Sequence, residues 1–167
     1  GEAAQILAID LSGPASARAM LDHALATFGK VDILVNNAGI LRTSHFGEFD
    51  LDELDQMIAV NYSTVVRSSI LFARHMKSSG AGQIVNVSSI GAGIAAAGTG
   101  IYGGLKLALE RFTEVLRIEL AGSGVRVGLV APGTTSTEIF EDMKSKGQAG
   151  WDEFLPAMQA EDIARAI

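Results

Sequence analysis

Residues 31–39 read VDILVNNAG, an almost uninterrupted apolar run that ends abruptly in asparagine, alanine and glycine. A short run of β-branched residues bounded by turn-forming residues is typical of a buried β-strand. Comparable apolar runs occupy residues 5–9, 83–87 and 125–130. Because these runs are nearly continuous rather than alternating, they predict parallel strands that are covered by helices on both faces.

Longer segments with helical periodicity separate these runs, at residues 15–28, 51–78, 102–120 and 161–167. Ser12 with Pro14 is a plausible start for the first helix, and Gly29 is a usual terminator. Asp50 and Glu53 have the spacing of a capping box before the second helix. Strands that alternate with helices predict an α/β fold, a three-layer doubly wound parallel sheet of the Rossmann type.

Composition limits the classes of protein that the chain can represent. Its 167 residues, 48% of them hydrophobic, suffice for a single domain over 1–167. The net charge of −6 disfavours nucleic acid and anionic membranes as partners. Without cysteine no disulfide or thiolate chemistry is possible, which permits a cytoplasmic location, and the three scattered histidines predict no metal site.

Polar and turn-forming residues follow each predicted strand. In a parallel sheet, ligands bind at the carboxyl ends of the strands, so Asp10, residues 36–39, Ser88 with Ser89, and residues 132–133 are candidate site residues. Taken singly, each of them is also explained by the backbone demands of a turn.

Tyr102 and Lys106 lie four residues apart at the start of a predicted helix, which places them on one face. A free tyrosine has a pKa of about 10. A nearby ammonium group would favour the phenolate and lower that pKa. Ser89 could donate a hydrogen bond to the same substrate oxygen while a hydride moves to or from its carbon. These residues therefore predict an acid/base site.

Six strings in a fixed order make the chain resemble the short-chain dehydrogenase/reductase family over nearly its whole length. They are AIDLS at 8–12, NNAG at 36–39, Asn61, IVNVSS at 84–89, Tyr102 with Lys106, and APG at 131–133 followed by Thr137. Ser89 lies 13 residues before Tyr102 and 28 after Asn61, and these spacings also match the family.

The resemblance implies a catalytic role for each of four residues. Tyr102 corresponds to the general acid/base, and Lys106 to the residue that lowers its pKa and holds the nicotinamide ribose. Ser89 corresponds to the group that orients the substrate carbonyl. Asn61 corresponds to the residue that anchors a water of the proton relay, in a break between two helical pieces. The alternative for Asn61 is a capping or kink residue.

The resemblance also implies a nicotinamide cofactor, with NADP slightly favoured over NAD. The residues that it places at this cofactor, besides Tyr102 and Lys106, are Asp10, Asn37, Ala38, Gly39, Pro132, Gly133, Thr135 and Thr137. Asp10 would contact the adenine, or alternatively cap the helix that follows it. The turn at 36–39 is at least as plausibly structural as it is a direct cofactor contact.

The substrate side would be formed by residues 40–43, by residues 90–99 and by a lid at about 134–156. The bulky residues expected there are Phe140, Met143, Trp151, Phe154 and Met158. Such a lid suggests a small, partly apolar carbonyl or alcohol, although Trp151 could equally pack the lid onto the domain. Residues 132–138, PGTTSTE, are similar to a branch of the family that includes clavulanic acid dehydrogenase.

Two departures from the family pattern stand out. Gly103 and Gly104 replace the usual alanine or serine, at a helix cost of about 1 kcal/mol each. The glycine-rich phosphate turn and the end of the second strand, which selects the cofactor, are absent from these residues. In the family's strand order, 3-2-1-4-5-6-7, the strand at 5–9 would then have no neighbour. We therefore expect a longer polypeptide of about 240 to 260 residues.

The sequence thus predicts an oxidoreductase that transfers a hydride between a nicotinamide and a small carbonyl or secondary alcohol. The alternative is a catalytically silent or truncated family member that serves as a binding or assembly subunit, and the missing phosphate turn favours it. Because the helices at 51–78 and 102–120 resemble those of the family's subunit interfaces, we also expect a homodimer or homotetramer.

Overall fold

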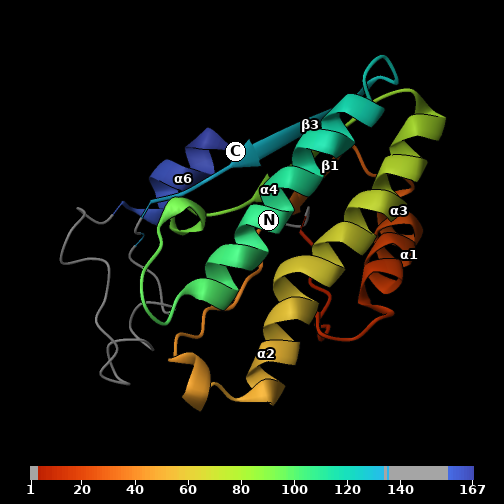
Figure 1. Cartoon of the computed structure of the whole chain (residues 1–167). Helices are drawn as coiled ribbons and strands as arrows, with labels where there is room; N and C mark the ends of the chain where they lie inside the picture. The colour runs from red at the N-terminus through yellow and green to blue at the C-terminus, as the bar shows by residue number, and fades with distance from the viewer. Residues whose placement is uncertain (1–3, 134, 136–157) are drawn as a thin grey trace.

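The computed structural model describes residues 4–133, 135 and 158–167 (Figure 1). Three strands, β1 (Ile33–Asn36), β2 (Gly82–Val87) and β3 (Val125–Val130), form a parallel sheet in the order β1-β2-β3. The helices are α1 (Ser16–Phe28), α2 (Leu51–Ile58), α3 (Thr64–Ser79), α4 (Gly100–Glu119) and α6 (Ala160–Ala166). Three shorter turns complete the regular structure, at Phe46–Glu48, Ala59–Ser63 and Ile90–Gly93.

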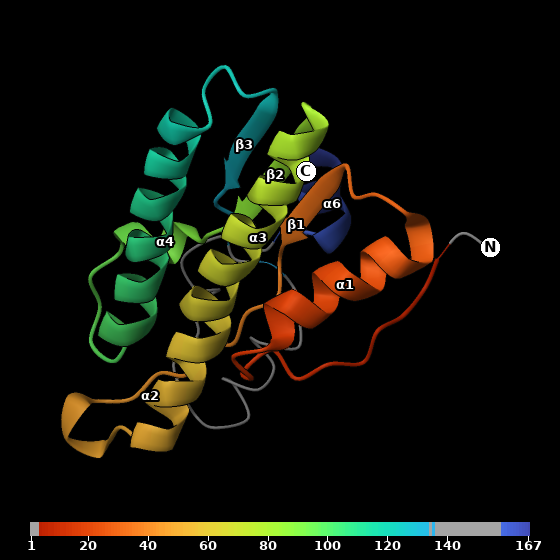
Figure 2. The same ribbon diagram turned by 90° about the vertical axis from the view of Figure 1, so that its right-hand side faces the viewer.

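The helices lie on both sides of the sheet. α3 packs on β1 and β2, α4 packs on β3, and α1 packs against α3, whereas α6 lies on the far side of the strands (Figure 2). This arrangement confirms the predicted Rossmann-like α/β fold with its parallel sheet. Within the described residues, no helix combines the length and the apolar character needed to cross a bilayer.

The strand expected at residues 5–9 is the one predicted element that the structure does not contain. Residues 4–10 form no regular structure, and the Ile6 side chain is 92% exposed. A strand is stabilised by hydrogen bonds to a neighbour, and no strand among the described residues pairs with this segment. On β1, Ile33 and Val35 are also exposed, so this strand is covered on one face only.

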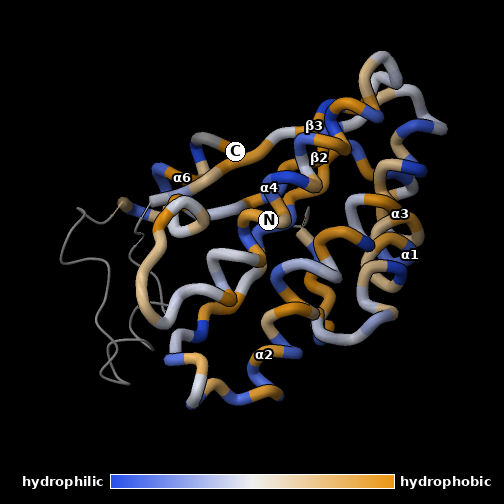
Figure 3. The backbone as a smooth tube through the Cα atoms, viewed as in Figure 1, coloured by the Kyte–Doolittle hydropathy of each residue, from blue (hydrophilic) through white to orange (hydrophobic). Residues whose placement is uncertain are grey.

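The hydrophobic core lies between the sheet and the layer of α1, α3 and α4. Its buried members are Leu21, Phe72, Ala73, Met76, Ile84, Leu116, Leu120, Val125 and Val127. Hydrophobic and hydrophilic residues alternate along these helices, as expected when one face is buried and the other is exposed (Figure 3). The core therefore holds the helices on the same face of the sheet.

Helix ends follow the sequence signals at some positions and not at others. Gly29 ends α1 in the left-handed conformation, with φ 76°, as predicted. Ser12 does not begin that helix, because α1 starts at Ser16 without a side-chain cap. Asp50 caps α2 by accepting a hydrogen bond from the backbone N–H of Asp52 at 2.8 Å. Its expected partner Glu53 forms an ion pair with Arg42 at 3.2 Å.

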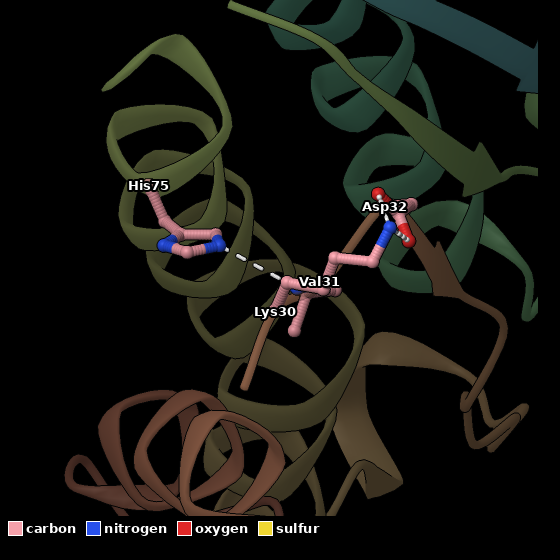
Figure 4. A network of polar contacts seen from close by, with 4 residues as sticks. All are labelled: Lys30, Val31, Asp32 and His75. Carbon is pink, nitrogen blue, oxygen red and sulfur yellow. Dashed lines mark hydrogen bonds and ion pairs between the residues drawn. The ribbon is translucent and has the colours of Figure 1, made fainter. Parts of the chain in front are cut away.

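The segment that leads into β1 is tied to α3 by His75. The backbone N–H of Val31 donates to His75 Nε2 at 3.4 Å, and Lys30 forms an exposed ion pair with Asp32 at 3.0 Å (Figure 4). His75 therefore has a structural contact that joins a helix to a strand.

A network of polar side chains joins β1 and β2 to the helices that cover them. Asn36 and Asn86 are register partners on β1 and β2, and Asn36 Nδ2 donates to Asn86 Oδ1 at 2.8 Å. Ser68 on α3 donates to Asn36 Oδ1 at 2.8 Å, and Ser69 Oγ accepts from Asn36 Nδ2 at 3.1 Å. On the other side, Asn86 Nδ2 donates to Thr113 of α4 at 2.9 Å. The network fixes the positions of four elements at once.

Replacing the centre of this network is expected to destabilise the fold. Asn86→Leu has a similar volume but removes the hydrogen bonds that Asn86 forms with Asn36 and with the buried Thr113, so we expect a loss of about 3 kcal/mol in the free energy of unfolding. Urea denaturation measures this loss. Gln83→Leu on the same strand removes only a contact with Arg126 near the surface. An equal loss in both variants would show that the network contributes nothing specific.

The two glycines of α4 differ in what surrounds them. A Cβ on Gly103 would lie 3.3 Å from the carbonyl oxygen of Gly91, which is tight, so this position needs a glycine for close packing. A Cβ on Gly104 would meet nothing within 4 Å. The departure from the family pattern thus has a packing reason at Gly103 only.

Gly104→Ala is therefore expected to stabilise the protein, because it removes the conformational freedom of glycine in the unfolded chain. We expect a gain of about 0.5 to 1 kcal/mol by urea denaturation. The matched variant Gly103→Ala should be neutral or destabilising. The opposite order of the two variants would contradict this description of α4.

Candidate active site at the carboxyl ends of the strands

A cavity of about 520 Å³ lies at the carboxyl ends of all three strands. Its walls come from the ends of β1, β2 and β3, from the first turns of α4 and from α6. The predicted site residues that line it are Asn37, Ala38, Gly39, Ser89, Tyr102, Lys106, Pro132, Gly133 and Thr135. The fold thus brings together residues that are almost 100 positions apart in the sequence, as expected for a parallel sheet.

Tyr102 and Lys106 lie one turn apart at the start of α4, as their spacing predicts. Lys106 is only 5% exposed, and its Nζ atom donates a hydrogen bond to the backbone carbonyl of Val87 at 3.0 Å. The same Nζ atom lies 5.7 Å from the centroid of the Tyr102 ring. The carbonyl at the end of β2 therefore holds the ammonium group beside the phenol ring.

Ser89 lies two residues beyond the end of β2 and lines the same cavity as Tyr102. Its Oγ atom accepts a hydrogen bond from the backbone N–H of Gly91 at 3.1 Å, which caps the turn at Ile90–Gly93. This contact leaves the Ser89 hydroxyl hydrogen free to be donated, and the Ser89 side chain acts on Tyr102, because it lowers the pKa of the phenol. Ser89 also lines the cavity.

Burial changes the pKa values of both Tyr102 and Lys106. It raises the pKa of the Tyr102 phenol, and the Ser89 side chain offsets this only in part. Burial also lowers the pKa of Lys106 to about 8. The effect of the Lys106 ammonium group on the pKa of Tyr102 stays a prediction. Tyr102 is held in its protonated form.

Asn61 lies in the π-helical turn Ala59–Ser63 between α2 and α3, where the sequence predicts a break. Its side chain is fully buried and binds both backbone groups of Ile40. Oδ1 accepts from the N–H of Ile40 at 2.8 Å, and Nδ2 donates to its carbonyl at 2.7 Å. The contacts of this side chain are therefore structural, because they hold the loop after β1 in place.

Gly39 is required where this loop passes the catalytic helices. A Cβ at this position would lie 3.2 Å from Asn61 Oδ1 and 3.7 Å from Lys106 Nζ. The absence of a side chain therefore lets the turn after β1 approach both residues closely.

Among the predicted cofactor residues that the structure describes, Asp10 does not line the cavity. The carboxylate of Asp10 is exposed and accepts hydrogen bonds from the backbone N–H and hydroxyl of Ser12 at 2.9 and 2.8 Å, so it stabilises a local turn. These bonds lower its pKa. Thr137 and most of the predicted lid, with Phe140, Met143, Trp151 and Phe154, lie outside the described residues.

The substrate side is partly as predicted. Ile40, Leu41, Thr43 and Thr99 line the cavity, which agrees with the segments expected there. The cavity is also lined by Ile163 and Ile167 at the C-terminal helix, and no pattern in the sequence places these two residues at the site. Isoleucine in a short amphipathic helix is so common that no signal distinguishes a cavity wall from ordinary packing.

Comparison with known proteins assigns the fold and site to a family. The family model described as short chain dehydrogenase matches residues 1–148, and the chain belongs to this family. The 3-oxoacyl-[acyl-carrier-protein] reductase of Salmonella typhimurium is 34% identical over 164 residues, which cover 96% of this chain and 67% of that protein. The finer resemblance to the clavulanic acid dehydrogenase branch stays a prediction.

Solved structures give the same result. The 3-ketoacyl-(acyl-carrier-protein) reductase of Brucella melitensis complexed with NADH has a TM-score of 0.88 and 31% identity, covering 99% of this chain and 70% of that one. The gluconate 5-dehydrogenase of Burkholderia cenocepacia, in complex with NADP and tartrate, has a TM-score of 0.84 and 28% identity, covering 95% and 64%. The chain spans about two thirds of the length of the curated relatives it matches.

The buried Lys106 predicts a pH-dependent stability. Its pKa is about 8 in the folded protein and 10.5 in the unfolded chain, so the unfolded state binds more protons between these values. Stability should therefore rise with pH across this window, relative to Lys106→Met, by on the order of 3 kcal/mol. Below the window both states are protonated and the buried charge destabilises the protein.

Urea denaturation of both proteins at several pH values measures this difference. Tyr102 is present in both, so its own titration is expected to contribute similarly to each. Parallel curves of stability against pH would contradict the description of Lys106 as a desolvated ammonium group.

Proposed function

We propose that the protein is a nicotinamide-dependent oxidoreductase that acts on a small carbonyl or secondary alcohol. The observation that carries this proposal is the meeting of Ser89, Tyr102 and Lys106 in one cavity at the carboxyl ends of the strands. Membership of the short chain dehydrogenase family supports it. The alternative of a catalytically silent subunit is less well supported, because the relatives that the chain matches are named as oxidoreductases, reductases and dehydrogenases.

The donors in the cavity fit the nicotinamide half of such a cofactor. The Lys106 ammonium and the Tyr102 phenol lie on one wall, where they could hydrogen-bond ribose hydroxyls, and the turns at 37–39 and 132–135 supply the facing backbone. When bound, the nicotinamide would supply or accept the hydride. NADP and NAD both remain in the proposal, with NADP first, because solved relatives carry NADP or NADH.

Tyr102 is proposed to donate its Oη proton to the substrate carbonyl oxygen as the carbon accepts a hydride. Its raised pKa keeps this proton in place near neutral pH, which favours the direction of carbonyl reduction. Ser89 would donate a second hydrogen bond to the same oxygen, since its contact with Gly91 uses Oγ only as an acceptor and leaves the O–H available. Lys106, partly or fully charged near pH 8, stabilises the phenolate that results.

Asn61 is proposed to contribute through its backbone. Both ends of its side-chain amide are bound by Ile40, so the backbone carbonyl would be the group left to anchor a water of the proton relay. The side chain itself positions the loop that forms part of the substrate wall.

A homo-oligomeric state and a cytoplasmic location are further parts of this proposal. The outward face of α4 carries exposed apolar side chains, among them Leu107, Val115 and Ile118. A face of this kind supports contact between two copies of the chain.

Tyr102→Phe tests the proposed chemistry, because it keeps the ring and removes only the proton donor. We expect turnover to fall by about 10³-fold or more while binding of the nicotinamide cofactor changes little. Binding is measured by fluorescence titration with NADPH and NADH. Turnover is measured with an acetoacetyl thioester and 5-oxogluconate, chosen for the named activities of the relatives.

Tyr62→Phe is the matched control, since Tyr62 does not line the cavity and is expected to leave turnover unchanged. Loss of both turnover and cofactor binding in Tyr102→Phe would contradict the assigned role. Failure of the wild-type protein to bind either cofactor would favour the silent-subunit alternative.

A further inference from the structure

One stripe of polar side chains runs along the whole length of α4 and faces the sheet. It begins at Tyr102 and Lys106 and continues at steps of three or four residues. Three further members bind the strands: Glu110 accepts from Ser88, Thr113 accepts from Asn86, and Arg117 donates to the carbonyl of Val127. The catalytic pair is therefore the first part of a continuous set of contacts between helix and strands.

Glu110 is the member of this stripe next to the catalytic pair. Its Oε1 atom accepts a hydrogen bond from Ser88 Oγ at 2.8 Å. Ser88 is only 4% exposed, and a hydrogen bond to a carboxylate is stronger than one between neutral groups. Ser88 lines the cavity, whereas Glu110 does not and reaches Ser88 from behind the cavity wall.

The contact between Glu110 and Ser88 lies close to the proposed reacting groups on both the helix and the strand. On α4, Glu110 lies one turn from Lys106 and two turns from Tyr102. On the strand side, Ser88 is the residue directly before Ser89. A shift of α4 along the sheet moves the Tyr102 hydroxyl group relative to that of Ser89, and a misplacement of about 1 Å can cost a large factor in rate.

We propose that Glu110 is a positioning residue, whose bond to Ser88 fixes α4, and with it Tyr102, relative to Ser89. This inference rests on the proposed function and deepens it. Glu110 does not touch the substrate or the cofactor. Its side chain acts as the hydrogen-bond acceptor for Ser88 Oγ. For this positioning role, the presence of an acceptor oxygen matters more than the negative charge.

Two variants separate the acceptor from the charge. Glu110→Leu removes the acceptor, and we expect kcat to fall about tenfold or more while KM for the nicotinamide changes less than about twofold. Glu110→Gln keeps an oxygen at the same place and should restore kcat to within about threefold of the wild type. Rates are expressed per cofactor-binding site, so that a loss of folded protein does not count as a loss of kcat.

Glu114 provides the matched control, since it lies one turn further along α4 and forms an exposed ion pair with Arg111 at 2.8 Å. Glu114→Leu and Glu114→Gln are expected to leave kcat unchanged. An unchanged kcat in Glu110→Leu, or an equal loss in Glu110→Leu and Glu110→Gln, overturns the inference.

A double variant tests the contact itself. Ser88 lines the cavity, so Ser88→Ala alone could also act directly on a ligand. If Glu110 works through Ser88, adding Glu110→Leu to Ser88→Ala should lower kcat by less than about twofold further. A full, independent loss in the double variant would contradict the inference.

A last measurement requires no substrate and no turnover. The ionisation of Tyr102 is followed by ultraviolet absorbance as a function of pH. For the wild type and for each Glu110 variant, the titration of the same protein with the added Tyr102→Phe substitution is subtracted. A weaker contact with Ser89 should move this ionisation to higher pH in Glu110→Leu but not in Glu110→Gln. If Tyr102 shifts in this way although the wild-type protein reduces no carbonyl, the proposed function fails and the positioning role stands. An unshifted titration in Glu110→Leu counts against the positioning role.

Discussion

The hydrogen bond between Asn36 and Asn86 is the constraint on which the rest of the structure depends. The two residues are partners in the register of adjacent strands, and a slip by one residue would turn each side chain to the opposite face. Because the Asn86 amide is fully buried, it has no solvent to replace a lost partner. The bond therefore favours one register of β1 against β2. This register places the turn after β1 next to Ser89, which follows β2, and both line the cavity.

The same network extends into the catalytic helix. Thr113 connects Asn86 to α4, and the contacts of Glu110 and Lys106 follow toward the N-terminal end of that helix. Polar contacts depend on direction as well as distance, so they position a helix along the sheet more narrowly than apolar packing can. This explains why the buried face of α4 carries so many polar groups at the end where chemistry is proposed.

The sequence predicted those features that depend on local pattern and spacing. It located three of four strands and the convergence of Ser89, Tyr102 and Lys106, because periodicity and the rule for parallel sheets decide these. The break at Asn61 followed from the resemblance to the family, since periodicity alone indicated one long helical segment at 51–78. The prediction failed for residues 5–9, where pairing with a neighbour decides the outcome. The rise in the pKa of Tyr102 could not be predicted either, since burial depends on tertiary packing. The pairing of Glu110 with Ser88 could not be anticipated, because a glutamate on a helix is usually exposed.

The exposed face of β1 has a consequence for how the protein behaves in solution. Ile33 and Val35 are only partly covered, and within the described residues β1 pairs with β2 alone. An edge strand with open backbone groups and apolar side chains is a template for another strand. Wherever this edge is left open, concentrated samples should tend toward edge-to-edge association and aggregation. A strand that pairs with β1 needs apolar side chains on the same face of the sheet as Ile33 and Val35.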